Sequence, residues 1–139
     1  MSYFLCVAVS NELHDIIKVF DERLLIEDVS SLPVGKATLG GNQRSKAFLV
    51  MMNGCSTDLL DAGARKRYSS RLFLDGLEGI LREAPSVSIL AHWFHGPISS
   101  ESVTAAQKIL MSFEELNMIY PAIEQDVRYV ITSPQDRPA

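Results

Sequence analysis

A lone cysteine stands directly after a predicted buried strand. Residues 47–52 form an apolar run that ends at Asn53-Gly54, and Cys55 follows this turn. A buried strand that ends in a tight turn is a common way to present a side chain, because the sheet fixes its position and the turn exposes it. Cys55 also precedes the expected start of a helix, and a helix N-terminus lowers the pKa of a thiol. This placement suits a nucleophilic cysteine.

A cysteine nucleophile works with a base, and His95 follows a second predicted strand, residues 86–94. If this strand and the strand at 46–52 are parallel neighbours, Cys55 and His95 emerge at the same edge of the sheet, and Asp58 could orient the histidine. The candidate catalytic residues are therefore Cys55, His95 and Asp58, and the chemistry would be thiol-dependent acyl or phosphoryl transfer. The alternative is that Cys55 is an ordinary turn residue, because no family signature accompanies it.

The histidines of the segment His92-Trp93-Phe94-His95 do not form a metal pair while the strand stays regular. Alternation along a strand places His92 and His95 on opposite faces, and a zinc site would need further ligands from elsewhere. We expect neither a metal nor another cofactor, with His92 partly buried and His95 at the turn. The carboxylates, Glu101 among them, fall on expected exposed helix faces, so no buried general acid is predicted.

Basic residues surround the glycines at 40–41 and form a weak candidate for an anion site. Lys36, Arg44 and Lys46 flank these glycines, and backbone amides of glycine-rich loops can hold a phosphate when cations lie nearby. The chain lacks the P-loop pattern and the dinucleotide-binding glycine pattern. The alternative is that this segment is a solvated loop and that the basic run at residues 65–71 is a solvated helix face.

Composition restricts the class of protein. The 139 residues are 47% hydrophobic and 22% charged, which is typical of one globular domain. The net charge of −4 argues against nucleic acid as a partner. We find neither a signal peptide nor an apolar run that would span a membrane. The 2 cysteines are too few for a disulfide framework, so a reducing cytoplasm is expected.

Apolar periodicity gives the expected elements. Strands are predicted at residues 3–9, 24–29, 46–52, 86–94 and 126–132, with a short hairpin piece at 36–39. Helices are predicted at residues 11–20, at 57–84 in two pieces, and from a cap at Ser99 to a break at Tyr120-Pro121. In the last helix Leu110 and Phe113 lie mid-face, so both are expected in the core.

These elements predict a single α+β domain over residues 1–133, with a disordered tail at 134–139. The sheet is expected to be mainly antiparallel or mixed, with five strands and about three covering helices, in ferredoxin-like order with an α-β extension. We expect a small soluble cytoplasmic binding or regulatory protein, such as a bacterial immunity or antitoxin-like partner. Its partner would be another protein, with neither nucleic acid nor membrane, and a homodimer stays open. The alternative function is a small enzyme that uses Cys55 with His95.

Overall fold

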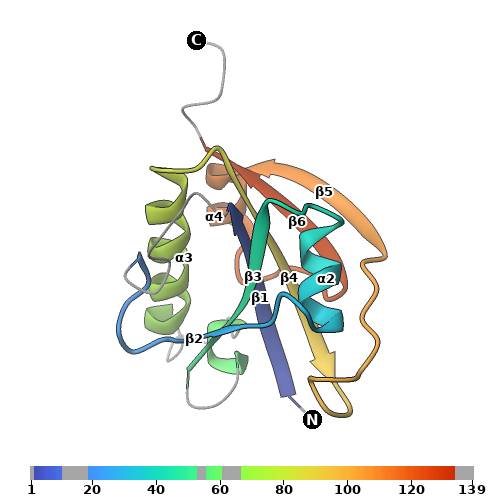
Figure 1. Ribbon diagram of the computed structural model, residues 1–139. Coiled ribbons are helices and arrows are strands. Elements are labelled where there is room, and N and C mark those ends of the chain that lie inside the picture. The colour runs from blue at the N-terminus through green and yellow to red at the C-terminus, as the bar shows by residue number, and fades with distance from the viewer. Residues whose placement is uncertain (1, 11–18, 53–55, 61–66, 134–139) are drawn as a thin grey trace.

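A six-stranded mixed sheet forms the centre of this α+β domain (Figure 1). The computed structural model describes residues 2–10, 19–52, 56–60 and 67–133. The strands are β1 (Ser2–Ser10), β2 (Leu25–Asp28), β3 (Ser45–Met51), β4 (Ser86–Phe94), β5 (Gln107–Ser112) and β6 (Val127–Thr132). The helices are α2 (Pro33–Leu39), α3 (Arg67–Leu81), α4 (Phe113–Ile119) and the short 3-10 helix η1 (Thr57–Leu60). None of the described helices is both long and apolar enough to cross a bilayer.

The strands lie in the order β2-β3-β1-β4-β6-β5. Neighbours are antiparallel except β5 and β6, which run parallel with Gln107 opposite Val127 and Ser112 opposite Thr132. β6 therefore lies between β4 and β5 in the sheet, although β5 precedes it in the chain. This arrangement leaves β2 and β5 as the two edge strands.

The sheet is covered on both faces, which explains why β1 is apolar along nearly its whole length. Leu5, Val7 and Val9 point to the face that carries α3 and α4, whereas Phe4 and Cys6 point to the face that carries α2. In Figure 1 α3 and α2 stand on opposite sides of the strands. The α3 side holds the larger core, and its fully buried members include Phe73, Leu77, Ile80, Ile89, Leu116 and Ile131.

The helix predicted to start at Ser99 is wrong, and this error changes the strand count from five to six. Residues 107–112 form β5, and α4 begins only at Phe113. Its N-cap is Ser112, whose hydroxyl accepts a hydrogen bond from the backbone N–H of Glu115 at 3.1 Å. This is the S-x-x-E capping box, a signal that the sequence carries at residues 112–115. Phe113 is buried as expected, but Leu110 is 67% exposed rather than part of the core.

The hairpin piece predicted at residues 36–39 is also wrong, because this segment is the helix α2. Pro33 occupies its first turn and Gly40 ends it in the left-handed conformation, with φ of 58°. Proline at the start and glycine after the end are the usual asymmetry of a helix. Gly35 lies so close to the Val29 carbonyl oxygen that a Cβ would collide with it. α2 therefore packs unusually close to the turn that follows β2.

The other predicted strands are confirmed within one or two residues, and β4 matches at both ends. Within the predicted helical region 57–84 the structure describes η1 and α3, and a break between them would lie at residues 61–66, outside the described residues. Gly76 packs against the ring of Phe20, where a Cβ would not fit, so tight packing accounts for a glycine within α3. Most of the first predicted helix and the predicted tail at 134–139 lie outside the described residues.

Candidate functional site

The strands that precede Cys55 and His95 end on the same side of the sheet, but they are not neighbours. β3 and β4 both pair antiparallel with β1, so they run parallel to each other and end at the same edge. Because β1 lies between them, about 10 Å separates the two strands. His95 follows β4 and is exposed. Cys55 and the side chain of Asp58 lie outside the described residues, so their distances to His95 remain predictions.

Ser56 fixes the start of the segment that follows Cys55. Its hydroxyl accepts a hydrogen bond from the backbone N–H of Leu5 at 2.8 Å and donates one to the carbonyl oxygen of Val50. Its own N–H donates to the Tyr3 carbonyl oxygen at 2.9 Å. Ser56 is fully buried. The chain is thus tied to β1 and β3 at the residue after the candidate nucleophile.

His92 lies between two carboxylates, an arrangement that sequence reasoning missed. Its Nδ1 is 2.6 Å from Asp126 Oδ1, and its Nε2 is 2.6 Å from Glu101 Oε2. The other oxygen of Glu101 accepts hydrogen bonds from the backbone N–H groups of His95 at 2.9 Å and Gly96 at 2.7 Å. The His92 side chain is 12% exposed, which confirms its expected partial burial, and the Glu101 side chain is 18% exposed. The prediction that Glu101 lies on an exposed helix face is therefore wrong.

We call the cluster of His92, Glu101 and Asp126 the clamp, because its imidazole ring lies within hydrogen-bond distance of both carboxylates. A doubly protonated imidazole ring can donate to both carboxylates, whereas a neutral ring could donate to only one. The hydrogen bond from His92 lowers the pKa of the Glu101 carboxyl, and the N–H groups of Gly96 and His95 lower it further. Both ring nitrogens already face partners, so no nitrogen is left to take a proton from a substrate. Among the described residues no group of three His, Cys, Asp or Glu side chains is arranged to hold a metal ion.

The clamp fixes the entry into β5. Asp126 adopts a left-handed backbone conformation with φ of 59°, which aspartate tolerates better than most residues. Its N–H donates to the Ala91 carbonyl oxygen at 2.8 Å, and its carbonyl oxygen accepts from the N–H of Ala106 at 2.6 Å. Ala106 immediately precedes β5. The contacts of one residue thereby join β4, the start of β5 and the start of β6.

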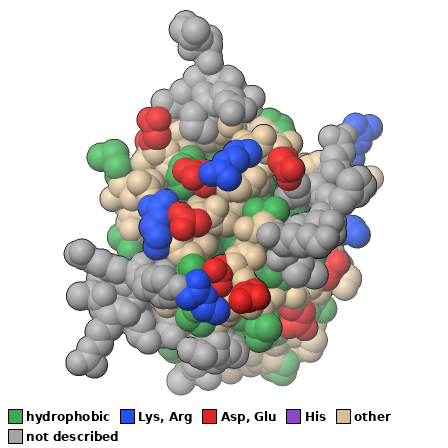
Figure 2. Space-filling view, turned by 90° about the vertical axis from the view of Figure 1, so that its left-hand side faces the viewer, with side chains coloured by type: hydrophobic (Ala, Val, Ile, Leu, Met, Phe, Trp, Pro, Cys, Tyr) green, Lys and Arg blue, Asp and Glu red, His purple; other side chains and the backbone are tan. Residues whose placement is uncertain are grey.

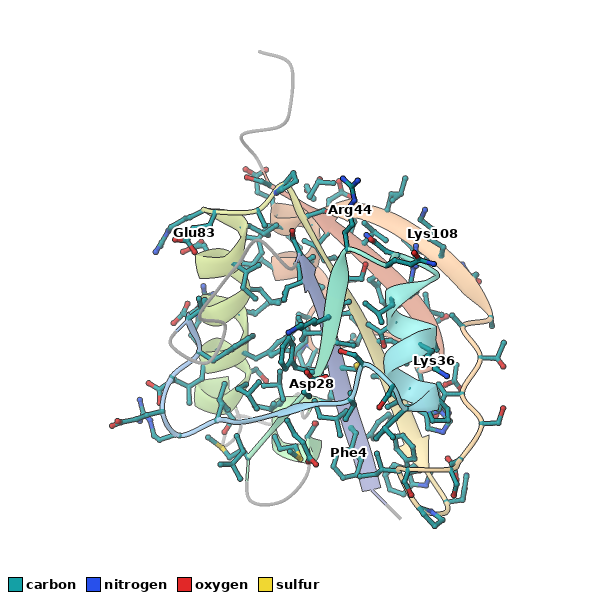
Figure 3. All side chains as sticks on the ribbon, in the orientation of Figure 1. Phe4, Asp28, Lys36, Arg44, Glu83 and Lys108 are labelled. Carbon is teal, nitrogen blue, oxygen red and sulfur yellow. The ribbon has the colours of Figure 1, made fainter. Side chains whose placement is uncertain are left out.

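The three predicted anion-binding residues do not lie together. Lys36 is exposed on α2, and Arg44 lines a hollow at the end of the sheet where β3 begins. Lys46 lies in β3 one residue after Ser45, which lines the same hollow, so alternation turns Lys46 to the opposite face. Figure 3 shows Lys36 on the α2 side and Arg44 where β3 begins. Lys46 therefore lies on the face of β3 opposite the hollow that Arg44 lines, and an anion site that includes all three residues stays a prediction.

The exposed face of α3 and the turn before β2 carry paired charges (Figure 2). Arg71 pairs with Asp75 at 2.8 Å, and Arg82 pairs with Glu78 at 3.2 Å, both one helical turn apart. In the turn before β2, Arg23 pairs with Asp21 at 2.7 Å. Charges paired in this way on a solvated surface contribute little stability. Arg71, the last residue of the basic run at residues 65–71, thus lies on a solvated helix face. For this residue the alternative interpretation holds.

β5 has an open edge and is the most apolar of the exposed strands of the sheet. Leu110 in β5 is 67% exposed, and Ile109 and Met111 on the other face of the strand are partly buried against the core. Met118 in the following helix α4 is 85% exposed. Within the described part of the chain, β5 pairs with β6 and with no other strand. Exposed apolar residues on an open strand edge mark a surface that another chain can cover.

No family model matches this chain, and neither the curated proteins nor the solved structures include one that is significantly similar.

Proposed function

We propose that this protein is a small binding protein that recognises another protein through the open edge of β5. The observation that carries this proposal is the 67% exposure of Leu110 on an edge strand with one neighbour among the described residues. An edge strand presents unpaired backbone N–H and C=O groups, to which a strand of a partner can add. The main chain would then supply hydrogen bonds, and Leu110 would supply apolar contact.

The two edges of the sheet differ in a way that supports this assignment. β2 at the other edge has only four residues, LIED, and two of them are acidic. Short length and charge are the usual means of protecting an edge from unwanted pairing. β5 has six residues, QKILMS, with a central apolar run and a single charge at Lys108. The protection present at β2 is largely missing at β5.

β5 is also held in place before any partner binds. Its six residues pair in register with β6, its first residue follows the hydrogen bond between Ala106 and Asp126, and its last residue caps α4. A strand whose shape is fixed in advance loses little conformational entropy on binding. We infer that the clamp at His92 serves this purpose.

The proposal extends to three finer points. A role as an immunity or antitoxin-like partner fits a small chain with a net charge of −4, and a reducing cytoplasm fits the free buried thiol of Cys6. A ferredoxin-like arrangement of β1 to β4 is supported by their antiparallel order β2-β3-β1-β4. The second candidate function is an enzyme that uses Cys55 with His95, and the parallel direction of β3 and β4 favours it.

Two leucine variants on opposite edges test the proposed binding surface. Leu110→Lys places a charge on the β5 edge, and Leu25→Lys is the matched control, because Leu25 is 59% exposed on the β2 edge. Tagged wild-type and variant chains are expressed in the native host at equal levels, and retained proteins are quantified by mass spectrometry. Circular dichroism first establishes that both variants fold.

We expect a specific partner to be retained by the wild type and by Leu25→Lys, and to fall at least roughly tenfold with Leu110→Lys, since a lysine on an edge opposes strand pairing. Equal retention by both variants would show that β5 is not the binding edge. If the wild type retains no protein that an unrelated acidic control protein does not also retain, the binding function itself would be overturned. If light scattering shows that the molar mass of the protein doubles as its concentration rises, the partner is a second copy of this chain.

A further inference from the structure

A hollow of about 520 Å³ opens on the α2 side of the sheet, beyond the end of that helix. Its volume falls within the range of small-molecule sites in proteins, roughly 300–1,000 Å³. One wall is the end of α2 and the loop that follows it, and the floor is formed by the last residues of β1 and the first residues of β3 and β4. The residues that matter for its chemistry are Leu39, Asn42, Arg44, Ser45, Ser86 and Ser88.

The floor of the hollow consists of small and hydroxyl-bearing side chains. Ser88 lies opposite Ala8 in the pairing of β4 with β1, and Ser45 lies opposite Ser10 in the pairing of β3 with β1. Further along the same face the floor would be blocked by larger side chains, such as Leu90, which belongs to the core under α2. Ser45, Ser86 and Ser88 are each partly exposed. Hydroxyl groups of this kind can donate hydrogen bonds to the oxygens of a ligand.

The electrostatics of the hollow favour an anion. Among the described residues that line it, Arg44 is the one charged residue and none is a carboxylate. The Arg44 side chain is exposed and forms no ion pair with a described residue. The backbone N–H of Arg44 donates to the side-chain oxygen of Asn42 at 2.9 Å, which fixes the loop beside the hollow. Arginine presents a planar set of donors that matches phosphate.

A second guanidinium reinforces the positive potential next to the hollow. Arg128 packs against Gly40 so closely that a Cβ at this residue would collide with it. It therefore lies at the carboxyl end of α2, where exposed carbonyl groups would otherwise repel an anion. Lys108 lies opposite Arg128 in the register of β5 and β6.

We propose that this hollow binds a small molecule that carries a phosphate monoester, with Arg44 as the main contact of the phosphate and Ser45, Ser86 and Ser88 as hydroxyl donors. The volume exceeds what a free phosphate ion needs, so the remainder of the ligand is polar and of metabolite size. The site lies on a different part of the sheet from the β5 edge and does not depend on the proposed protein partner.

Titrations followed by ¹⁵N NMR test this site directly. The folded chain is titrated with inorganic phosphate and with glycerol phosphate, and chloride and acetate are added in parallel at matched pH and ionic strength. We expect saturable shifts of the backbone amides at residues 42–45 and 86–88 with both phosphates. Arg44→Gln should weaken the binding roughly tenfold or more, as the loss of a charge-assisted hydrogen bond implies.

Lys46→Gln is the matched control, because it removes one positive charge two residues away, on the face of β3 opposite the hollow, and it should bind both phosphates as the wild type does. Ser88→Ala should weaken binding less than Arg44→Gln. Leu110→Lys should bind phosphate unchanged, which separates this site from the proposed function. Absence of saturable shifts, equal weakening by Arg44→Gln and Lys46→Gln, or equal binding of acetate would overturn the proposal.

Discussion

Shortening Leu110 to alanine should leave the protein almost as stable as before, whereas the same change at Leu116 should destabilise it strongly. Full burial of a leucine side chain contributes about 1.5–3 kcal/mol. Leu110 is 67% exposed, so only about a third of that contribution, roughly 0.5–1 kcal/mol, is at stake. Leu116 is fully buried between α4 and the sheet, and a leucine-to-alanine change at such a site costs about 2–5 kcal/mol.

Urea unfolding of the wild type and both variants, followed by circular dichroism, gives the free energies of unfolding by linear extrapolation. The two variants remove the same atoms from residues six positions apart. The strand propensity of alanine is lower than its helix propensity, which adds to the loss at Leu110 and not at Leu116, so a larger loss at Leu116 reports its burial. A loss above about 2 kcal/mol for the Leu110 variant would refute its place on an open edge. Equal losses for the two variants would instead support the continuous helix that apolar periodicity predicted for this segment.

Three further outcomes follow from the described contacts. Below pH 4.5, the usual pKa of the Glu101 carboxyl, the wild type should lose stability more steeply than Glu101→Gln. A carboxyl whose pKa is lowered by folding stabilises the protein at a pH above its unfolded-state pKa, and this contribution is lost as the pH falls through its folded-state pKa. Urea unfolding from pH 7 to pH 3 measures the free energies, and an equal dependence on pH for both proteins would contradict the expectation. Gly35→Ala should destabilise by at least ~1–3 kcal/mol, since its Cβ would collide with the Val29 carbonyl oxygen and displace α2; an unchanged melting temperature would show that α2 packs less closely. Iodoacetamide at pH 7 should leave Cys6 of the folded chain unmodified, because burial raises its pKa to about 12; mass spectrometry then assigns any fast labelling to Cys55, which would favour the enzyme alternative, whereas labelling of Cys6 would contradict its burial.

The elements that the sequence predicted well are those whose pattern is set by burial on both faces. β1 and β4 carry long apolar runs because helices cover both faces of the sheet. β5 was missed because Val103, Ala106, Leu110 and Phe113 follow helical spacing by chance. What decides its structure is the parallel edge of β6, which comes later in the chain.

The clamp at His92 could not be predicted from the local sequence pattern, for a related reason. Its partners Glu101 and Asp126 lie 9 and 34 residues away, and chain reversals bring them together. Nothing in the spacing of these residues predicts that they meet. The hollow beside Arg44 could be predicted only in part: the basic residue near the glycines at 40–41 was identified, but the hydroxyl floor comes from three strands whose order the sequence did not reveal.

The position of β6 between β4 and β5 has a consequence for synthesis of the chain. On the ribosome β4 and β5 emerge before residues 127–132, yet in the sheet these two strands have no pairing with each other. Until β6 emerges and inserts, β4 keeps an open apolar side and β5 has no strand to join. Unpaired strand edges of this kind are the sites at which nascent chains aggregate or recruit chaperones. The surface proposed to bind a partner is thus the last part of the sheet to form, so a partner that recognises it would recognise only a completed sheet.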